Sequence, residues 1–429
     1  MNQNPDNDGK ETVHKSKANA ISKMEVWLAY KQVKSNRGAG GVDGQSLADF
    51  EVNLENNLYK IWNRMASGSY MPPPVLEVTI PKKDGGSRTL GIPTVSDRIA
   101  QMVVKNRIEP RLETVFHPNS YGYRPGKSAY DALAITRKRC WKYDWVIDLD
   151  IKAFFDNIDH DLLLKAVTHH VDEKWIISYV KRWLTAPLQK QDTGKQIERT
   201  RGTPQGGVIS PLLANLFLHY VFDHWMKTHH PGAPFARYAD DAVVHCQSEA
   251  NARELLEEIK QRFAECGLQI HPEKTKVVYC KDDGRQGEYK ETKFKFLSYE
   301  FRARGAWSSK YKMLFIGFIP AISRDSILSL REEIRSWEWQ SQVHLNLEDL
   351  AKQVNAMIRG WINYYGRFYV SQFNREVLRY LNDRLVIWAA QKYKRFKKSK
   401  RRARKWLQQI YLRDPGLWVH WSHGIGMYG

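Results

Sequence analysis

The sequence lacks the features that would assign the chain to a membrane, a secretory pathway or a zinc site. No apolar run approaches the roughly 20 residues that a membrane-spanning helix needs. Residues 1–17 are polar and mixed in charge, which argues against a secretory signal and favours disorder. The cysteines are far apart and form no metal-ligand pair, so free thiols in a reducing cytoplasm are expected. They are Cys140, Cys246, Cys266 and Cys280.

Acidic residues are also in deficit. The chain of 429 residues carries 67 basic and 47 acidic side chains, a formal net charge of +20. This excess indicates a polyanionic partner, most simply nucleic acid, because phosphates neutralised by lysine and arginine release counterions. Association with ribosomes or with a membrane surface would give the same excess. The 15 Trp and 21 Tyr add aromatic surface for stacking on unpaired bases, although most of these rings are expected in the core.

Two adjacent carboxylates, Asp240 and Asp241, lie between short apolar runs. Apolar flanks around a polar centre predict a β-hairpin with the acids at its tip. Like charges with buried neighbours are costly unless a cation is bound, and hard oxygen ligands favour Mg²⁺. A solvated Asp-Asp turn is the alternative, and for the pair taken alone it is the commoner case.

A second acidic strand changes that balance. Residues 145–151 are apolar and β-prone, yet Asp148 and Asp150 lie two positions apart and therefore on one face of the predicted strand. A pair of metal ions that clamps the attacking and leaving oxygens of a phosphoryl displacement needs carboxylates from separate segments. Asp150, Asp240 and Asp241 supply such a set.

The order of the predicted helices and strands favours an α+β fold over a doubly wound sheet. Helical patterns cover residues 18–66, 95–115, 159–185, 210–230 and 249–266, with Ser96 as an N-cap and Gly267 as a C-terminal stop. Residues 75–81 and 88–92 predict two strands joined by a hairpin turn at 82–86. From residue 322 to 412 the pattern is almost only helical. The expected packing anchors there are Trp337, Trp339, Trp361 and Trp388.

Eight sequence blocks, in order, resemble the reverse transcriptases encoded by group II introns, the maturase-reverse transcriptases of bacteria. The resemblance covers roughly residues 35–425. The order is informative because any one block alone would be weak evidence. The blocks are residues 38–44, 80–82 with 87–93, 120–126, 145–160, 202–207 with 210–215, 238–241, 267–276 and 296–299.

The resemblance implies a right-hand polymerase, with fingers and a palm that carries the catalytic β-hairpin, followed by an all-helical thumb or maturase region. It divides the chain into a partly disordered N-terminal segment (1–34), fingers and palm (35–310), a helical thumb/maturase domain (311–390) and a basic nucleic-acid-binding tail (391–429). Many relatives end in a nuclease domain with a His-Asn-His metal site and paired cysteines. Too few residues follow Gly424 for that domain, and no CxxC occurs, so we expect no second-strand cleavage.

The same resemblance implies roles for individual residues near the acids. Asp150, Asp240 and Asp241 would hold Mg²⁺, with the backbone carbonyl of Ile151 as a further ligand. Asp150 is preferred over Asp148 because its spacing to Phe155 matches the acid-to-aromatic spacing of these polymerases, although strand register leaves Asp148 as the alternative.

Substrate contacts are implied as well. Phe155 would exclude a 2′-hydroxyl and so select deoxynucleotides. Gln205 would bind the incoming nucleotide, and Gly206 would permit close backbone approach. Lys274 would protonate the departing pyrophosphate, with Lys276 as a nearby alternative. Three cationic side chains would contact triphosphate, template or substrate phosphate: Lys82, Arg88 and Arg124.

The sharpest charge feature is residues 391–406, which hold ten basic residues and no acid. Such a run is usually a solvated, partly helical arm, but beside polymerase motifs it is expected to grip nucleic-acid backbone without reading sequence. Tyr393, Phe396 and Trp406 would stack on exposed bases. The basic residues expected to bind are Lys394, Arg395, Lys397, Lys398, Lys400, Arg401, Arg402, Arg404 and Lys405.

Taken together, the sequence predicts an RNA-directed DNA polymerase that copies a group II intron RNA and assists its splicing. The expected partners are that RNA, the DNA target with its primer/template duplex, and dNTPs, in a bacterial cytoplasm and at the nucleoid when bound to DNA. The sequence is also compatible with a homodimer. The alternatives are a splicing cofactor with a vestigial polymerase site and a host-defence or diversity-generating reverse transcriptase; intact acids argue against the first, and the helical C-terminal region argues against the second.

Overall fold

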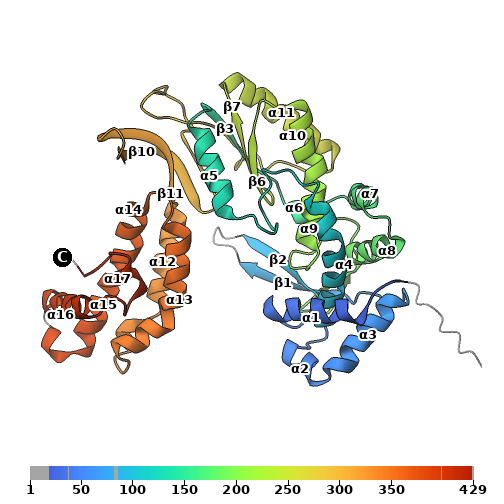
Figure 1. Cartoon of the computed structure of the whole chain (residues 1–429), viewed down its shortest axis with the longest axis horizontal. Helices are drawn as coiled ribbons and strands as arrows, with labels where there is room; N and C mark the ends of the chain where they lie inside the picture. Colours follow the sequence, from blue (N-terminus) through green and yellow to red (C-terminus); the bar gives the residue numbers. More distant parts are fainter. Residues whose placement is uncertain (1–18, 37, 82–85, 398, 428–429) are drawn as a thin grey trace, which may run out of the picture. The chain divides into compact units, whose positions relative to one another are not determined.

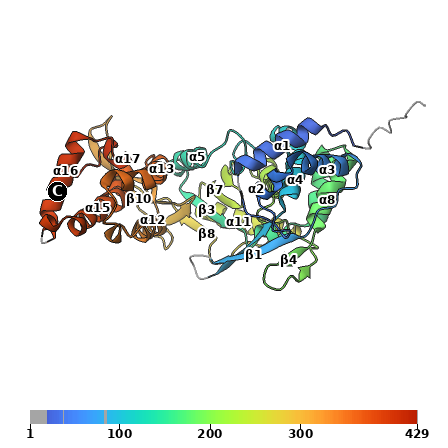
Figure 2. The same cartoon turned by 90° about the horizontal axis from the view of Figure 1, so that it is seen from below.

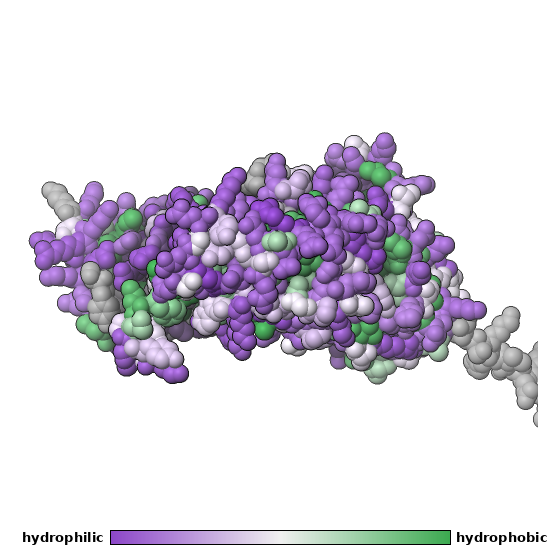
Figure 3. Space-filling view, turned by 90° about the horizontal axis from the view of Figure 1, so that it is seen from above, coloured by the Kyte–Doolittle hydropathy of each residue, from purple (hydrophilic) through white to green (hydrophobic). Residues whose placement is uncertain are grey.

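A computed structural model describes residues 19–36, 38–81, 86–397 and 399–427 of the chain (Figure 1). Over these residues the architecture mixes helices with three β-sheets, as an α+β fold requires. Within the described residues no helix combines the length and apolarity needed to cross a bilayer. The face of the molecule drawn in Figure 3 is mainly hydrophilic.

The chain folds into two compact units, and it passes between them several times. The first unit comprises residues 1–126, 151–230 and 259–269, and the second comprises 127–150, 231–258 and 270–429. Helix α11 (Glu249–Glu265) spans the boundary at residue 258. The division into N-terminal segment, fingers and palm, thumb and tail stays a prediction.

The first unit holds most of the N-terminal helices and one small sheet, in the strand order β2-β1-β4-β5. Strands β1 and β2 form the predicted antiparallel hairpin, in which Pro81 faces Ser87. The turn residues 82–85, and with them Lys82, lie outside the described residues. The elements are α1 (Lys23–Asn36), α2 (Leu47–Val52), α3 (Leu54–Ala66), β1 (Val75–Pro81), β2 (Ser87–Ile92), α4 (Val95–Glu113), α6 (Phe154–Asn157), α7 (His160–His170), α8 (Lys174–Thr185), β4 (Leu188–Lys190), β5 (Gln196–Ile197), α9 (Ser210–Leu218), η1 (His219–Asp223) and α10 (His224–His229).

Helix α4 begins at Val95, as predicted, but its cap is a different residue. Its N-cap is Thr94, whose side chain accepts a hydrogen bond from the amide of Asp97, so the prediction of Ser96 as the cap was wrong. Thr94 has the extended backbone that a cap residue needs, and it directly precedes the first helical residue, Val95.

A buried polar relay runs from α4 to the start of α9. Asp97 is 1 % exposed and accepts hydrogen bonds from Tyr70, Trp183 and Gln101. Burial raises the pKa of Asp97, which these donors partly offset. The side-chain oxygen of Gln101 accepts the amide of Val208 at 2.8 Å. The relay therefore fixes the glycine-rich turn that precedes α9, since its buried amide needs a partner.

The second unit contains the acidic strand and hairpin in one sheet of order β6-β7-β3-β8. Helix α5 lies along this sheet and contacts β6 and β7 (Figure 1). A second sheet has the order β11-β10-β9. The elements are α5 (Ala129–Cys140), β3 (Trp145–Asp150), β6 (Phe235–Tyr238), β7 (Asp241–Cys246), β8 (Lys276–Tyr279), β9 (Lys293–Phe296), β10 (Tyr299–Ser308), β11 (Met313–Ile322), α12 (Arg324–Ser336), η2 (Trp339–Ser341), α13 (Leu347–Tyr365), α14 (Val370–Phe373), η3 (Asn374–Leu378), α15 (Arg379–Lys392), η4 (Lys394–Phe396), α16 (Lys400–Arg413) and α17 (Val419–Ser422).

The helices of the C-terminal region begin at Arg324, close to the predicted start of the helical pattern at residue 322, and follow strand β11 (Met313–Ile322). From α12 onward they gather around one apolar core (Figure 2). Trp339 and Trp388, two of the predicted anchors, are buried in it. The other two, Trp337 and Trp361, stack in parallel with centroids 5.6 Å apart at the edge of that core.

One buried polar cluster ties the last helix to this core. The side-chain oxygen of Asn382 accepts hydrogen bonds from His420 Nε2 at 2.7 Å and from Trp421 Nε1 at 3.0 Å. Its amide donates to the carbonyl of Gly426 at 3.1 Å. Burial lowers the pKa of His420 to about 3, so the ring is neutral in the folded protein and Nε2 carries the proton.

Acid should therefore destabilise this region through His420. The folded ring titrates near pH 3 and the unfolded one near 6.5, so the unfolded state alone gains a proton as pH falls below about 6.5. The stability that depends on neutral His420 is complete above that pH and declines by up to about 1.4 kcal/mol per unit below it. We expect His420→Gln, which keeps a donor, to flatten the fall between pH 6.5 and 5, as measured by urea unfolding followed by tryptophan fluorescence. Exposed His423→Gln is the control; equal slopes in wild type and His420→Gln would refute the assignment.

Candidate active site

The acidic hairpin forms as predicted, with Asp240 in the turn and Asp241 at the start of β7. Ala239, also in the turn, has a left-handed backbone with φ of 58°, a conformation that residues other than glycine adopt at some energetic cost. The buried guanidinium of Arg237 donates to the carbonyl of Ala239 at 2.8 Å. This bond stabilises the strained turn and so fixes the backbone that carries the side chains of Asp240 and Asp241.

Strand pairing brings the acids of the two segments together. In the antiparallel ladder between β3 and β7, Asp150 faces Asp241 directly and Asp148 faces Val243. Directly opposed side chains lie about 5 Å apart at Cβ. Burial, followed by the charges of Asp240 and Asp150, raises the pKa of Asp241 to about 7.

Asp148 belongs to the same electrostatic cluster. Burial, then the charges of Asp241 and Asp150, hold its pKa well above the ordinary range, while Lys276 opposes the shift. Asp150, and not Asp148, lies directly opposite Asp241 in the ladder. The preference for Asp150 over Asp148 as a metal ligand stays a prediction. The Asp150 side chain is 36 % exposed, and Lys274 Nζ lies 3.7 Å from its Oδ2.

The loop before β8 fixes the backbone of Asp150. Its carbonyl accepts the amide of His271 at 2.8 Å and the hydroxyl of Thr275 at 3.3 Å. The Asp150 amide in turn donates to the Thr275 hydroxyl at 3.2 Å. Sequence reasoning missed both supporting residues. Thr275 lies between the two lysines already singled out, but nothing in its pattern indicated a contact with Asp150.

The carboxylate set suits a divalent cation. Among the described residues no three His, Cys, Asp or Glu side chains converge closely enough to form a complete metal cluster. Even so, the donors are hard oxygens, and the raised pKa of Asp241 reflects buried like charges whose repulsion a cation relieves. Asp150, Asp240 and Asp241 are thus the residues that could hold one.

A second group of predicted residues meets within the first unit. The carbonyl of Phe155, a buried residue of α6, accepts the amide of Thr203 at 2.8 Å. The Gln205 carbonyl accepts the amide of Gly91 at 2.8 Å, and its side-chain oxygen accepts Arg88 Nε at 2.8 Å. This places Arg88, Phe155 and Gln205 around one turn.

The turn depends on Gly206. Its φ of +125° is one that residues with a side chain rarely adopt, and a Cβ there would lie 2.5 Å from the carbonyl oxygen of Gly91. The backbone that closely approaches Gly206 in this structure is that of Gly91 in strand β2. A substrate contact at Gly206 remains a prediction.

The guanidinium of Arg124 is bound by other residues of the protein. Its side chain is 5 % exposed and forms an ion pair with Glu113 at 2.9 Å. One guanidinium nitrogen also donates to the carbonyls of His117 and Ser120. These bonds account for Arg124 without a ligand, and its predicted phosphate contact would require the pair with Glu113 to open.

Comparison with known proteins decides the family. The model of "Reverse transcriptase (RNA-dependent DNA polymerase)" matches residues 80–301, about half of the chain and the whole span of the acids. The chain belongs to the reverse transcriptase family. Members of this family use divalent metal ions, in keeping with the carboxylate set. A second model, "Group II intron, maturase-specific domain", matches residues 327–406. This reverse transcriptase is therefore of the group II intron-encoded type and carries a maturase domain.

Individual relatives agree. Protein YkfC of Escherichia coli is 30 % identical over 298 residues, which are 60 % of this chain and 77 % of the relative. Group II intron-encoded protein LtrA of Lactococcus lactis is 34 % identical over 197 residues, 45 % of this chain but only 32 % of LtrA. Putative COX1/OXI3 intron 1 protein of Saccharomyces cerevisiae is 28 % identical over 223 residues, 52 % of this chain and 26 % of the relative.

The basic run at residues 391–406 of this reverse transcriptase packs against the core of the maturase region. The sequence had also suggested a solvated arm here. Phe396 is 6 % exposed and joins the apolar core with Ala403 and Leu407 of α16. Tyr393 and Trp406 pack against each other with centroids 4.9 Å apart. The prediction that Phe396 stacks on bases was thus wrong, because its ring is buried in the core.

The cations of the run mostly face solvent, as backbone binding requires. Arg404 is half-buried and pairs with Asp383 at 2.7 Å. Lys398 lies outside the described residues. The exposed members are Lys394, Arg395, Lys397, Lys400, Arg401, Arg402 and Lys405.

Proposed function

We propose that this reverse transcriptase copies its own intron RNA into DNA at a site that holds two Mg²⁺ on Asp150, Asp240 and Asp241. The observation that carries the proposal is the β3–β7 register, which sets Asp150 against Asp241 beside the Asp240 turn. When bound, the cations would activate the primer 3′-hydroxyl and stabilise charge on the transferring phosphoryl group. The backbone carbonyl of Ile151 follows the strand and would add an oxygen.

Residues around the glycine-rich turn would handle the nucleotide. Gln205 would bind it, and Arg88, now donating to Gln205, would reach its phosphates together with Lys82. The Phe155 ring would fill the space that a 2′-hydroxyl needs. Lys274 would deliver a proton to the departing pyrophosphate, a role supported by its position 3.7 Å from Asp150 Oδ2.

The maturase region would bind the intron RNA and favour its spliced fold. The match at residues 327–406 supports this role over a defence-type reverse transcriptase. The exposed cations of η4 and α16 support backbone contacts, since lysine and arginine that face solvent neutralise phosphates without reading sequence. A vestigial polymerase site is disfavoured, because the carboxylates, Phe155 and Gln205 are all retained.

Asp241→Asn should abolish polymerisation while leaving the fold intact. We expect primer extension on poly(rA)/oligo(dT) with Mg²⁺ and dTTP to fall by roughly 1,000-fold or more, since the metals contribute several kcal/mol to the transition state. Without metal the melting temperature should hold or rise, because the variant removes a buried charge whose pKa is raised. Asp161→Asn, on an exposed position of α7, is the control. Full activity in Asp240→Asn and Asp241→Asn would disprove the site.

Phe155→Val should relax sugar selection. We expect the ratio of kcat/KM for dTTP over UTP to fall by about 10- to 200-fold, the usual value of a removed steric contact. Phe154→Val is the matched control, because Phe154 is a neighbouring buried ring with no predicted role and its loss should lower stability without moving the ratio. An unchanged ratio in Phe155→Val would remove the residue from the nucleotide site.

The two activities should separate. A variant with Lys397, Lys400, Arg401 and Arg402 changed to Gln should splice the cognate intron poorly at low Mg²⁺, because phosphate contacts are lost. Asp241→Asn should splice like the wild type. Gel assays of precursor and ligated exons measure both, and equal splicing by the neutralised variant would exclude the run from the RNA-binding surface.

A further inference from the structure

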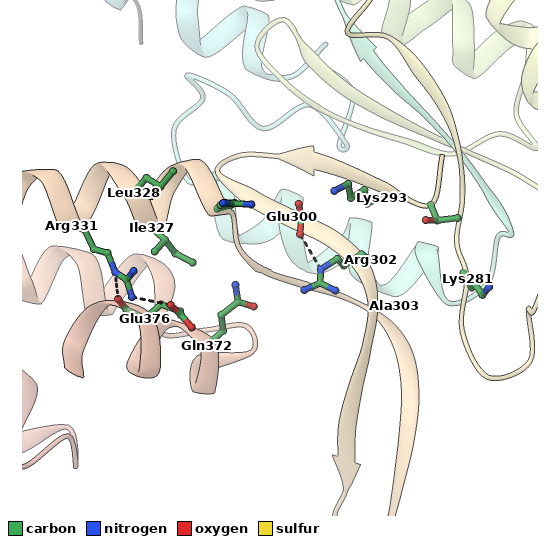
Figure 4. A pocket seen from close by; sticks show the side chains of 12 residues that line it. Lys281, Lys293, Glu300, Arg302, Ala303, Ile327, Leu328, Arg331, Gln372 and Glu376 are labelled. Carbon is green, nitrogen blue, oxygen red and sulfur yellow. Dashed lines mark hydrogen bonds and ion pairs between the residues drawn. The ribbon is translucent and has the colours of Figure 1, made fainter. Parts of the chain in front are cut away.

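A basic groove lies within the second unit, apart from the acidic cluster. Strands β9 and β10 form one side of it and helix α12 the other, with α14 and η3 at its end (Figure 4). Its volume is about 760 Å³. The charged residues that line it are Lys281, Lys293, Arg302, Arg324, Arg331, Glu300 and Glu376.

Both carboxylates of the groove are already neutralised. Glu300 pairs with Arg302 at 3.0 Å, and it also contacts Arg304. Glu376 pairs with Arg331 at 2.9 Å. Figure 4 shows these two pairs on opposite sides of the groove.

The remaining three cations are not neutralised by the protein. Within the described residues no ion pair involves the side chains of Lys281, Lys293 or Arg324. The nearby Asp325 is taken by Lys295. The groove therefore presents an uncompensated positive charge, the condition that favours an anionic ligand.

Strand β10 leads from this groove to an aromatic tip. Arg302 lines the groove, and Trp307 follows five residues later, about 17 Å along an extended strand. Trp307 is 61 % exposed and Tyr311, in the turn, is 67 % exposed. Lys310 Nζ lies 5.0 Å from the centre of the Tyr311 ring. Residues 301–324 contain five basic residues and no acidic one.

We propose that the groove and the β10–β11 tip form one binding surface for single-stranded RNA, with backbone phosphates on Lys281, Lys293 and Arg324 and unpaired bases on Trp307 and Tyr311. Exposed aromatic rings favour a single strand over a duplex, because only unpaired bases present a free face for stacking. The surface is separate from the basic run at residues 391–406. The assignment rests on the proposed function only in naming RNA as the anion.

The test measures binding of the full chain to a labelled single-stranded RNA by fluorescence anisotropy at several salt concentrations, without Mg²⁺ or dNTP. For the variant with Lys281, Lys293 and Arg324 changed to Gln, we expect the slope of log K against log salt to shrink by about 2, from roughly 0.7 per lost phosphate contact. The control with Lys60, Lys165 and Lys227 changed to Gln removes equal charge from exposed positions of the first unit. An unchanged slope in the groove variant, or an equal loss in the control, overturns the proposal.

The aromatic tip has its own readout. Trp307→Ala with Tyr311→Ala should weaken binding about 5- to 100-fold while leaving the salt slope unchanged, because stacking releases no counterions. Tyr59→Ala, which removes a ring that is 50 % exposed on α3, should have no effect. Unaltered affinity in the tip variant overturns the single-strand assignment, as does an equal loss for an RNA duplex of the same length.

Failure here is distinguishable from failure of the proposed polymerase. Both variants should extend saturating poly(rA)/oligo(dT) at the wild-type rate, which also shows that they fold. Loss of extension in either variant would place these residues in the polymerase site and overturn a separate surface. A wild type that binds RNA but extends no primer would refute the polymerase alone.

Discussion

The antiparallel pairing of β3 with β7 is the constraint on which the geometry of the candidate active site depends. It sets Asp150 directly against Asp241 and leaves Asp240 in the adjoining turn. A shift of one residue would turn Asp150 to the other face of the sheet and replace it with an apolar neighbour. In the observed register Val146, Ile147, Val243 and Val244 are all buried in the core.

The close approach of these carboxylates has a cost that the rest of the site moderates. Without a bound cation, burial and then the repulsion between the carboxylates raise the pKa values of Asp148 and Asp241. Lys274 opposes the shift at Asp241, and the loop before β8 holds Asp150 through its backbone. The Asp150 carboxylate itself pairs with Lys274. The three acids therefore form a cluster of like charges that a bound cation would stabilise.

Much of the fold was predictable because its signals are local. The acidic hairpin, the β1–β2 hairpin, the α11 helix with its stop at Gly267, and the helical C-terminal region all follow from periodicity and turn residues. One error was local. Thr94, not Ser96, caps α4, because the helix starts at Val95 and the Thr94 side chain accepts the amide of Asp97. Another error arose where a distant partner decided. Phe396 was assigned to bases from its basic neighbours, although the core formed by α15 and α16 takes the ring.

The sequence by itself determined that Asp150, Asp240 and Asp241 lie in or beside strands, because their apolar flanks specify the acidic strand and the hairpin. It also determined the family, through the ordered blocks. Only the tertiary structure decided which carboxylates face one another and that Arg124 forms an ion pair with Glu113. It also decided that Lys281, Lys293 and Arg324 line the same groove. The reason is physical: local pattern sets the direction in which a side chain points, whereas pairing and neutralisation depend on residues far apart in the chain that only folding brings together.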